Sequence, residues 1–190
     1  MIKEVIEHYG LEAQLNMTTE VCGELACDCA EILSVTAQTG CIDPKRIDDG
    51  ELTKDMAHVK NAILSVCHLL NIPISRLTNS REPVVEDGVL GKLEQKLLSL
   101  SWSCNLLIIC CNKFLRASGH GYQIFLSEKT TICNLVDAMC YVFSDIEGLR
   151  TFLGISEDRI NRIIEDSDKM AYALMQINTA SNKISEVTHE

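Results

Sequence analysis

Helical periodicity dominates this chain and leaves little room for a sheet. Apolar side chains recur every three or four residues over most of its 190 positions, whereas the alternation typical of strands is scarce. The three prolines, Pro44, Pro73 and Pro83, all fall between periodic segments of the first half. The pattern therefore predicts an all-α protein folded as a helical bundle.

Five amphipathic segments follow one another along the sequence. Gly154 suits the end of the fourth helix, and Ser156 is a suitable N-cap for the fifth. A polar, frayed tail is expected from Ser181 onward. The predicted helices cover about residues 16–38, 51–71, 93–114, 132–153 and 160–177.

The spacing also predicts which side chains form the core. In the first helix the core-facing residues are expected to be Met17, Val21, Leu25 and Ile32. In the last helix the corresponding apolar residues are Ile160, Ile163, Ala171, Leu174 and Ile177.

Two similar turns point to an internal duplication. Residues 71–77 follow the second helix in the same way that residues 153–160 follow the fourth. The stretch between Asn71 and Gly88 contains two prolines and reads as a linker. We therefore expect two related halves, residues 1–78 and 88–180, joined by a linker at 79–87 and followed by a polar tail at 181–190.

Composition excludes several classes of protein. Hydrophobic residues make up 46% and charged residues 23%, which is typical of a globular chain rather than a disordered one. The net charge of −10 argues against nucleic acid as a partner. The apolar run from Leu106 to Cys111 is too short for a bilayer, and no signal peptide is visible. A cytoplasmic protein without a membrane partner is expected.

Ten cysteines are present, and most lie within the apolar helical segments. We expect them to be free core thiols in a reducing compartment. The alternative is a zinc site formed by Cys27, Cys29 and Cys41, although their spacing differs from that of the usual zinc motifs.

Carboxylates cluster on the first helix. Glu20, Glu24, Asp28 and Glu31 follow one another at spacings of four and three, which places them on one side of a helix. Asp55 and His58 share a face of the second helix. Facing helices that each present carboxylates are how helical bundles build divalent metal sites. The alternative is a solvated acidic face.

The order of residues around these helices resembles the MazG-like all-α NTP pyrophosphohydrolases. His8-Tyr9-Gly10 and then Gln14 lead into Glu20-Val21-Cys22-Gly23-Glu24-Leu25, where the family has an E-E-x-x-E-L helix. The stretch from Lys54 to Val59 is similar to the family's E-E-x-A-D-V. The resemblance covers about residues 5–77 and implies that each half is MazG-like, so that the chain would be a fused pseudo-dimer.

The resemblance also implies a chemistry. In the family, four carboxylates bind Mg²⁺, and a nucleoside triphosphate is cleaved to a monophosphate and pyrophosphate. The matching positions here are Val21, Glu24, Asp55 and His58, which implies catalytic roles for Glu24 and Asp55. Val21 cannot bind a cation, and His58 would suit Mn²⁺ better than Mg²⁺. With neighbouring carboxylates included, the candidate metal ligands are Glu20, Glu24, Asp28, Asp55 and His58.

The second half departs further from the family pattern, because its matching positions read Trp102 and Asn105. We therefore expect it to be a structural partner. Trp102 is a candidate for stacking on a base, with a core position as the alternative. The other candidate ligand-binding residues are Lys54, Lys60, Asn61 and Arg46.

Three functions remain open from the sequence. The first is a nucleotide-binding protein with a degenerate metal site, binding or sequestering a nucleotide or a nucleotide-derived signal with little or no hydrolysis. The second is an NTP pyrophosphohydrolase that depends on Mg²⁺ or Mn²⁺. The third is a structural or interaction protein whose acidic face is merely solvated. A homo-oligomer is compatible with each of them.

Overall fold

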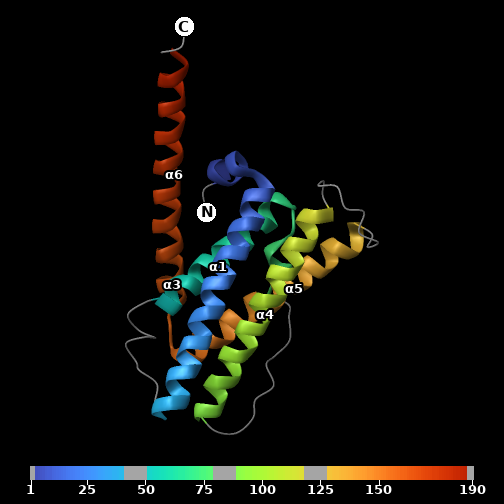
Figure 1. Ribbon diagram of the computed structural model, residues 1–190, viewed down its shortest axis with the longest axis vertical. Helices are drawn as coiled ribbons and strands as arrows, with labels where there is room; N and C mark the ends of the chain where they lie inside the picture. The colour runs from blue at the N-terminus through green and yellow to red at the C-terminus, as the bar shows by residue number, and fades with distance from the viewer. Residues whose placement is uncertain (1–2, 41–50, 79–88, 118–127, 188–190) are drawn as a thin grey trace.

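The computed structural model describes residues 3–40, 51–78, 89–117 and 128–187 (Figure 1). These residues form an all-α bundle and include no strand, which confirms the predicted fold class. The predicted linker at 79–87 lies outside them. The elements are α1 (Lys3–Thr39), α3 (Glu51–Leu69), the 3-10 helix η1 (Ile74–Arg76), α4 (Val89–Ala117), α5 (Glu128–Leu153) and α6 (Glu157–Val187).

Helix α1 is longer than predicted and is kinked at Gly10, whose φ of 76° and ψ of 179° are not helical. Its core-facing stripe also differs from the prediction. Met17 is 48% exposed, so its placement in the core was wrong, and Val21 is only half-buried. The buried positions repeat at spacings of three and four and hold several small or weakly polar side chains. They are Leu15, Thr18, Cys22, Leu25, Cys29, Ile32 and Thr36.

The apolar stripes that the periodicity predicts over residues 52–70, 93–114 and 132–153 supply most of the core on α3, α4 and α5. Helix α4 packs against α1 on one side and α5 on the other, and α3 packs against α1. Figure 1 shows α1 and α4 side by side and running in opposite directions. Residues Gly91–Ala117 are long and apolar enough to cross a membrane by length and composition alone. Here many of these apolar residues belong to the bundle core, including Leu93, Leu97, Leu100, Leu107 and Phe114.

The ends of α3 and α5 have the same geometry. Asn71 (φ 53°) and Gly154 (φ 70°) both adopt the left-handed conformation that terminates a helix. The next amide reaches back five residues in each case, from Ile72 to Cys67 O at 2.8 Å and from Ile155 to Arg150 O at 3.0 Å. These bonds satisfy carbonyls that the helix leaves unpaired. The predicted stop at Gly154 is thus confirmed.

Helix α6 begins where the sequence predicted, because Ser156 Oγ accepts a hydrogen bond from the Arg159 amide at 3.3 Å. It packs mainly on α3. The prediction of a frayed tail from Ser181 was wrong as far as Val187, since the helix continues to that residue. Leu174 and Ile177 were also misplaced, because they are 53% and 60% exposed rather than part of the core.

The cysteines follow the sequence prediction. All nine in the described part of the chain are free, and six of them are buried. Cys22 and Cys104 meet at the contact between α1 and α4, where a hydrogen bond between the two thiols and burial raise the pKa of Cys104. Cys41 lies outside the described residues, so the zinc alternative is not tested.

Candidate functional site

The acidic site is centred on two carboxyl groups from facing helices. Asp28 on α1 and Asp55 on α3 are joined by a side-chain hydrogen bond. Two carboxylates can hydrogen-bond only when one holds a proton. Both side chains are half-buried, so the two carboxyl groups lie at the edge of the core.

The surroundings of Asp55 favour its protonated form. Burial, the charge and hydrogen bond of Asp28, and the charges of Glu24 and Glu51 raise the pKa of Asp55 from 3.8 to about 7. Desolvation and nearby like charge both disfavour a carboxylate. The pair therefore holds a proton near neutral pH, in contact with solvent on one side and the core on the other.

A buried thiol lies beneath this pair. Cys29 is fully buried, and burial together with the nearby Cys104, Asp28 and Asp55 raises its pKa. A thiol that stays protonated is a poor metal ligand and a poor nucleophile. Cys29 therefore acts as a small apolar core residue next to the carboxyl pair.

Glu51 was missed by the sequence reasoning. It lies in the first turn of α3, one turn before Asp55, and its charge acts on Asp55. The spacing of four residues between Glu51 and Asp55 was the signal that could have found it. Glu51 also benefits from the positive end of the α3 dipole.

His58 and Asn61 make contacts with α6 instead. His58 Nε2 lies 3.3 Å from Ser167 Oγ, and Asn61 Nδ2 donates to Asp168 Oδ1 at 3.0 Å. Asp168 is only 9% exposed, and no local sequence pattern indicated its role. These side chains form a polar layer between α3 and α6.

Lys60 is part of an ion-pair network between α3, α5 and α6. Its Nζ donates to Glu147 Oε1 at 2.8 Å and lies 3.7 Å from Glu157 Oε1. The ammonium also lies 5.2 Å from the centroid of the Phe143 ring. The Lys60 side chain is 7% exposed, so binding a phosphate would require it to give up a buried partner.

The remaining candidate residues are spread over the surface. Lys54 is exposed on α3, and Glu20 is exposed on α1. Trp102 is 63% exposed on α4, so a core position for it is excluded. Arg46 lies outside the described residues. The structure thus brings together Glu24, Asp28 and Asp55 of the sequence-predicted set.

The carboxylates do not fit a closed divalent metal site. In the part of the chain that is described, no group of three or more His, Cys, Asp or Glu side chains is arranged to hold an ion. Asp28 and Asp55 hydrogen-bond to each other instead of converging on a shared point. Metal ligands bind in their deprotonated form, so the carboxyl group that holds the shared proton is a poor ligand for Mg²⁺.

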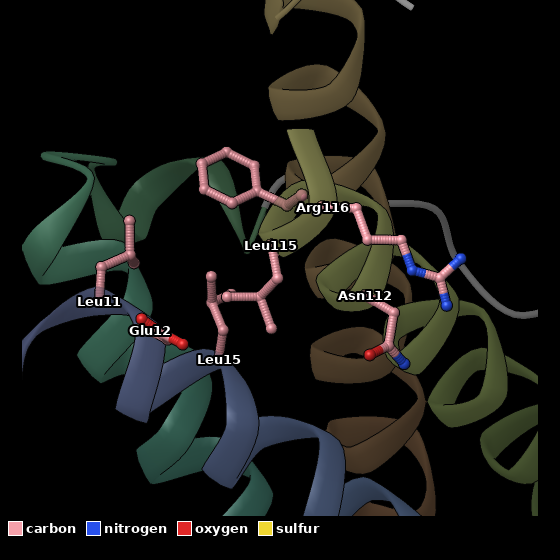
Figure 2. A pocket seen from close by; sticks show the side chains of 7 residues that line it. Leu11, Glu12, Leu15, Asn112, Leu115 and Arg116 are labelled. Carbon is pink, nitrogen blue, oxygen red and sulfur yellow. The ribbon is translucent and has the colours of Figure 1, made fainter. Parts of the chain in front are cut away.

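A separate hollow of about 390 Å³ lies at another place in the bundle, between the start of α1 and the end of α4. Figure 2 shows Leu11, Leu15 and Leu115 around it, with Glu12 and Arg116 on opposite sides. None of the predicted site residues lines this hollow.

No family model, curated protein or solved structure matches this chain. Its function is therefore inferred from its own side chains and their surroundings.

Proposed function

We propose that this chain is a nucleotide-binding protein of MazG-like fold whose metal site is degenerate. It binds or sequesters a nucleotide or a nucleotide-derived signal with little or no hydrolysis. The observation that carries the proposal is the carboxyl cluster of Glu24, Asp28 and Asp55 between α1 and α3. Glu24 and Asp55 are the two acidic residues that match the ligand positions of the family, and they come from the two helices that the resemblance implies.

The chemistry of the cluster favours binding over turnover. A position that should hold a carboxylate is Val21, and His58 contacts Ser167 on α6. A protonated Asp55 can donate a hydrogen bond to a sugar or base, and the ionised carboxylates can accept one. A triphosphate would approach this acidic face as its complex with a divalent cation, which removes the like-charge repulsion.

We further infer that two helical hairpins, one formed by α1 and α3 and the other by α4 and α5, derive from one duplicated unit. The buried residues of α3 and α5 correspond at a separation of 83 positions, as Leu52 and Leu135 do. Asn71 and Gly154 are related by the same separation, and so are the fully buried Leu77 and Ile160. On α1 and α4, Leu15 corresponds to Leu97 and Cys22 to Cys104 at a separation of 82. An experimental structure tests this: the two hairpins should superpose with these residues in register, and unrelated crossing angles would contradict it.

Thermal unfolding in the presence of nucleotides tests the proposed function. Each common NTP and dNTP is added with Mg²⁺, with Mn²⁺ or with a chelator, and pyrophosphate release is measured in parallel. A ligand at about 100 times its Kd adds about 2.7 kcal/mol to the free energy of unfolding. For a chain of this size that raises the Tm by about 5–10 °C. No stabilisation by any nucleotide would contradict the proposal.

Substitutions locate the binding face. Lys54→Glu should weaken nucleotide binding, because it replaces an exposed positive charge on the same turn of α3 as Asp55 with a negative one. Lys113→Glu on α4 is the matched control and should leave binding unchanged.

Glu24→Gln separates the two candidate activities: a binding protein keeps its affinity within a few-fold, whereas a pyrophosphohydrolase loses metal-dependent pyrophosphate release. The raised pKa of Asp55 is the observation that keeps the hydrolase alternative open, because such shifts gather at active sites.

A further inference from the structure

The hollow between α1 and α4 lies directly after the kink in α1. Gly10 interrupts the helix, and Leu11 and Leu15 on the following turns line the hollow. Figure 1 shows the segment before Gly10 turned away from the axis of the rest of α1. Because α1 and α4 run in opposite directions, the kink lies level with the end of α4. A space of about 390 Å³ remains at this level.

The floor of the hollow is apolar. Leu15 is fully buried and Phe114 is 8% exposed, whereas Leu11 and Leu115 are half-buried. Small-molecule sites in proteins are concave, mostly apolar and about 300–1,000 Å³ in volume, with a few polar groups that orient the ligand. The floor therefore favours a ligand with an apolar body.

Polar groups of opposite charge flank this floor. Figure 2 shows Glu12 of α1 on one side and Asn112 and Arg116 of α4 on the other. Asn112 and Arg116 are four residues apart and share a face of α4. Glu12 and Arg116 are both exposed, and none of the ion pairs among the described residues involves either of them. Both charges are thus available to a ligand.

The two charges indicate the class of ligand. A guanidinium binds a carboxylate through two parallel hydrogen bonds, and a carboxylate accepts strong hydrogen bonds from an ammonium group. Only a molecule that carries both groups matches Arg116 and Glu12 together. Such a zwitterion has no net charge, so the net charge of −10 on the protein does not repel it.

The size of the hollow sets the separation of the two groups. A sphere of the same volume is about 9 Å across, and two residues of extended peptide span about 7 Å. A free amino acid carries both charges on one carbon and cannot reach both sides. We propose that the hollow binds apolar dipeptides with free ends. The carboxylate meets Arg116 and Asn112, the ammonium meets Glu12, and the side chains pack on the apolar floor.

Isothermal titration calorimetry of the full chain with leucyl-leucine tests this site independently of the acidic site. Leucyl-leucine should bind saturably. N-acetyl-leucyl-leucine, which lacks the ammonium, and leucyl-leucine amide, which lacks the carboxylate, should each bind about 10-fold or more weakly. Glu12→Gln should weaken leucyl-leucine to a similar extent and remove most of the effect of acetylation. Arg116→Met should do the same for the effect of amidation.

Lys113→Met and Glu20→Gln are the matched controls, because they remove the same charges from exposed positions on the same two helices outside the hollow. Both should keep the affinity of the wild type. Glu12 and Arg116 are exposed, so their variants should keep the helical circular dichroism of the wild type. Absence of saturable binding up to about 5 mM leucyl-leucine would overturn the proposal. Acetylation or amidation that costs the variants as much as the wild type would place the ligand elsewhere and also overturn it.

Discussion

Replacing Asp55 with Asn should remove a defined part of the pH dependence of stability. In the unfolded chain Asp55 titrates near 3.8, whereas the folded protein holds its proton up to about pH 7. The folded state therefore binds more protons between these values, and the free energy of unfolding falls as pH rises from about 4 to 7. Above about pH 7 the contribution of Asp55 is constant, because both states have lost the proton.

The magnitude follows from the two pKa values. For a fully shielded group, the difference between 3.8 and about 7 corresponds to about 4 kcal/mol. Asp55 is only half-buried, so solvent screening reduces this to about 1–2 kcal/mol. Asp55→Asn should therefore stabilise the protein by about 1–2 kcal/mol at pH 8, or about 2–8 °C in Tm, with little effect at pH 4.

Urea unfolding of the wild type and Asp55→Asn, from about pH 4 to 8.5, measures the difference directly. The comparison isolates Asp55 from other groups. Asp145, for example, has a pKa raised mainly by burial, and its contribution is common to both proteins. Glu20→Gln, at an exposed carboxylate on α1, is the control and should keep the wild-type slope. Parallel pH profiles for the wild type and Asp55→Asn would refute the contact between Asp28 and Asp55.

Three further variants or measurements test the fold. Lys60→Met should lower the free energy of unfolding by about 1–3 kcal/mol in urea titrations, because it leaves the half-buried Glu147 with one cationic partner fewer. Gly154→Ala should cost about 1 kcal/mol by the same assay, since alanine is strained at a φ of 70°. Thiol titration without reductant should find nearly all cysteines reactive in denaturant. Among the described cysteines, the exposed Cys27 and Cys133 should react first in the native protein. Finding several disulfides would contradict the account.

The core was predictable where large apolar side chains fill it and less so where small ones do. Leucine, valine and methionine mark the buried faces of α3, α4 and α5, so periodicity located them. On α1 the buried stripe includes Thr18, Cys22, Cys29 and Thr36, which a pattern of large hydrophobic residues does not register. Met17 was misplaced for that reason. Leu174 and Ile177 on α6 were placed in the core although they are exposed, because periodicity alone cannot distinguish a core face from an exposed apolar face.

The residues of the candidate site were predictable where the signal is local, and their partners were not predictable where tertiary packing supplies them. The spacing of the carboxylates on α1 is local, and it led to Glu24 and Asp28. Asp55 was found from its spacing to His58 and from the family resemblance. The partners of Lys60 and Asn61 lie 87 and 107 residues away, on α5 and α6. Only the packing of the helices brings these groups together. The sequence therefore suggested that Lys60 could bind phosphate, whereas the folded protein pairs it with Glu147.

Pyrophosphate release by the double variant Val21→Glu, His58→Asp tests the central claim most directly. This variant restores a carboxylate at each position where the chain departs from the family's ligand pattern. Val21→Gln, His58→Asn has similar shape without the charge and is the control; circular dichroism checks that both are folded. The account predicts little or no release by the wild type and the control, and release dependent on Mg²⁺ or Mn²⁺ by the restored variant. A folded double variant that neither releases pyrophosphate nor is stabilised by any nucleotide would contradict a MazG-like nucleotide site in this bundle.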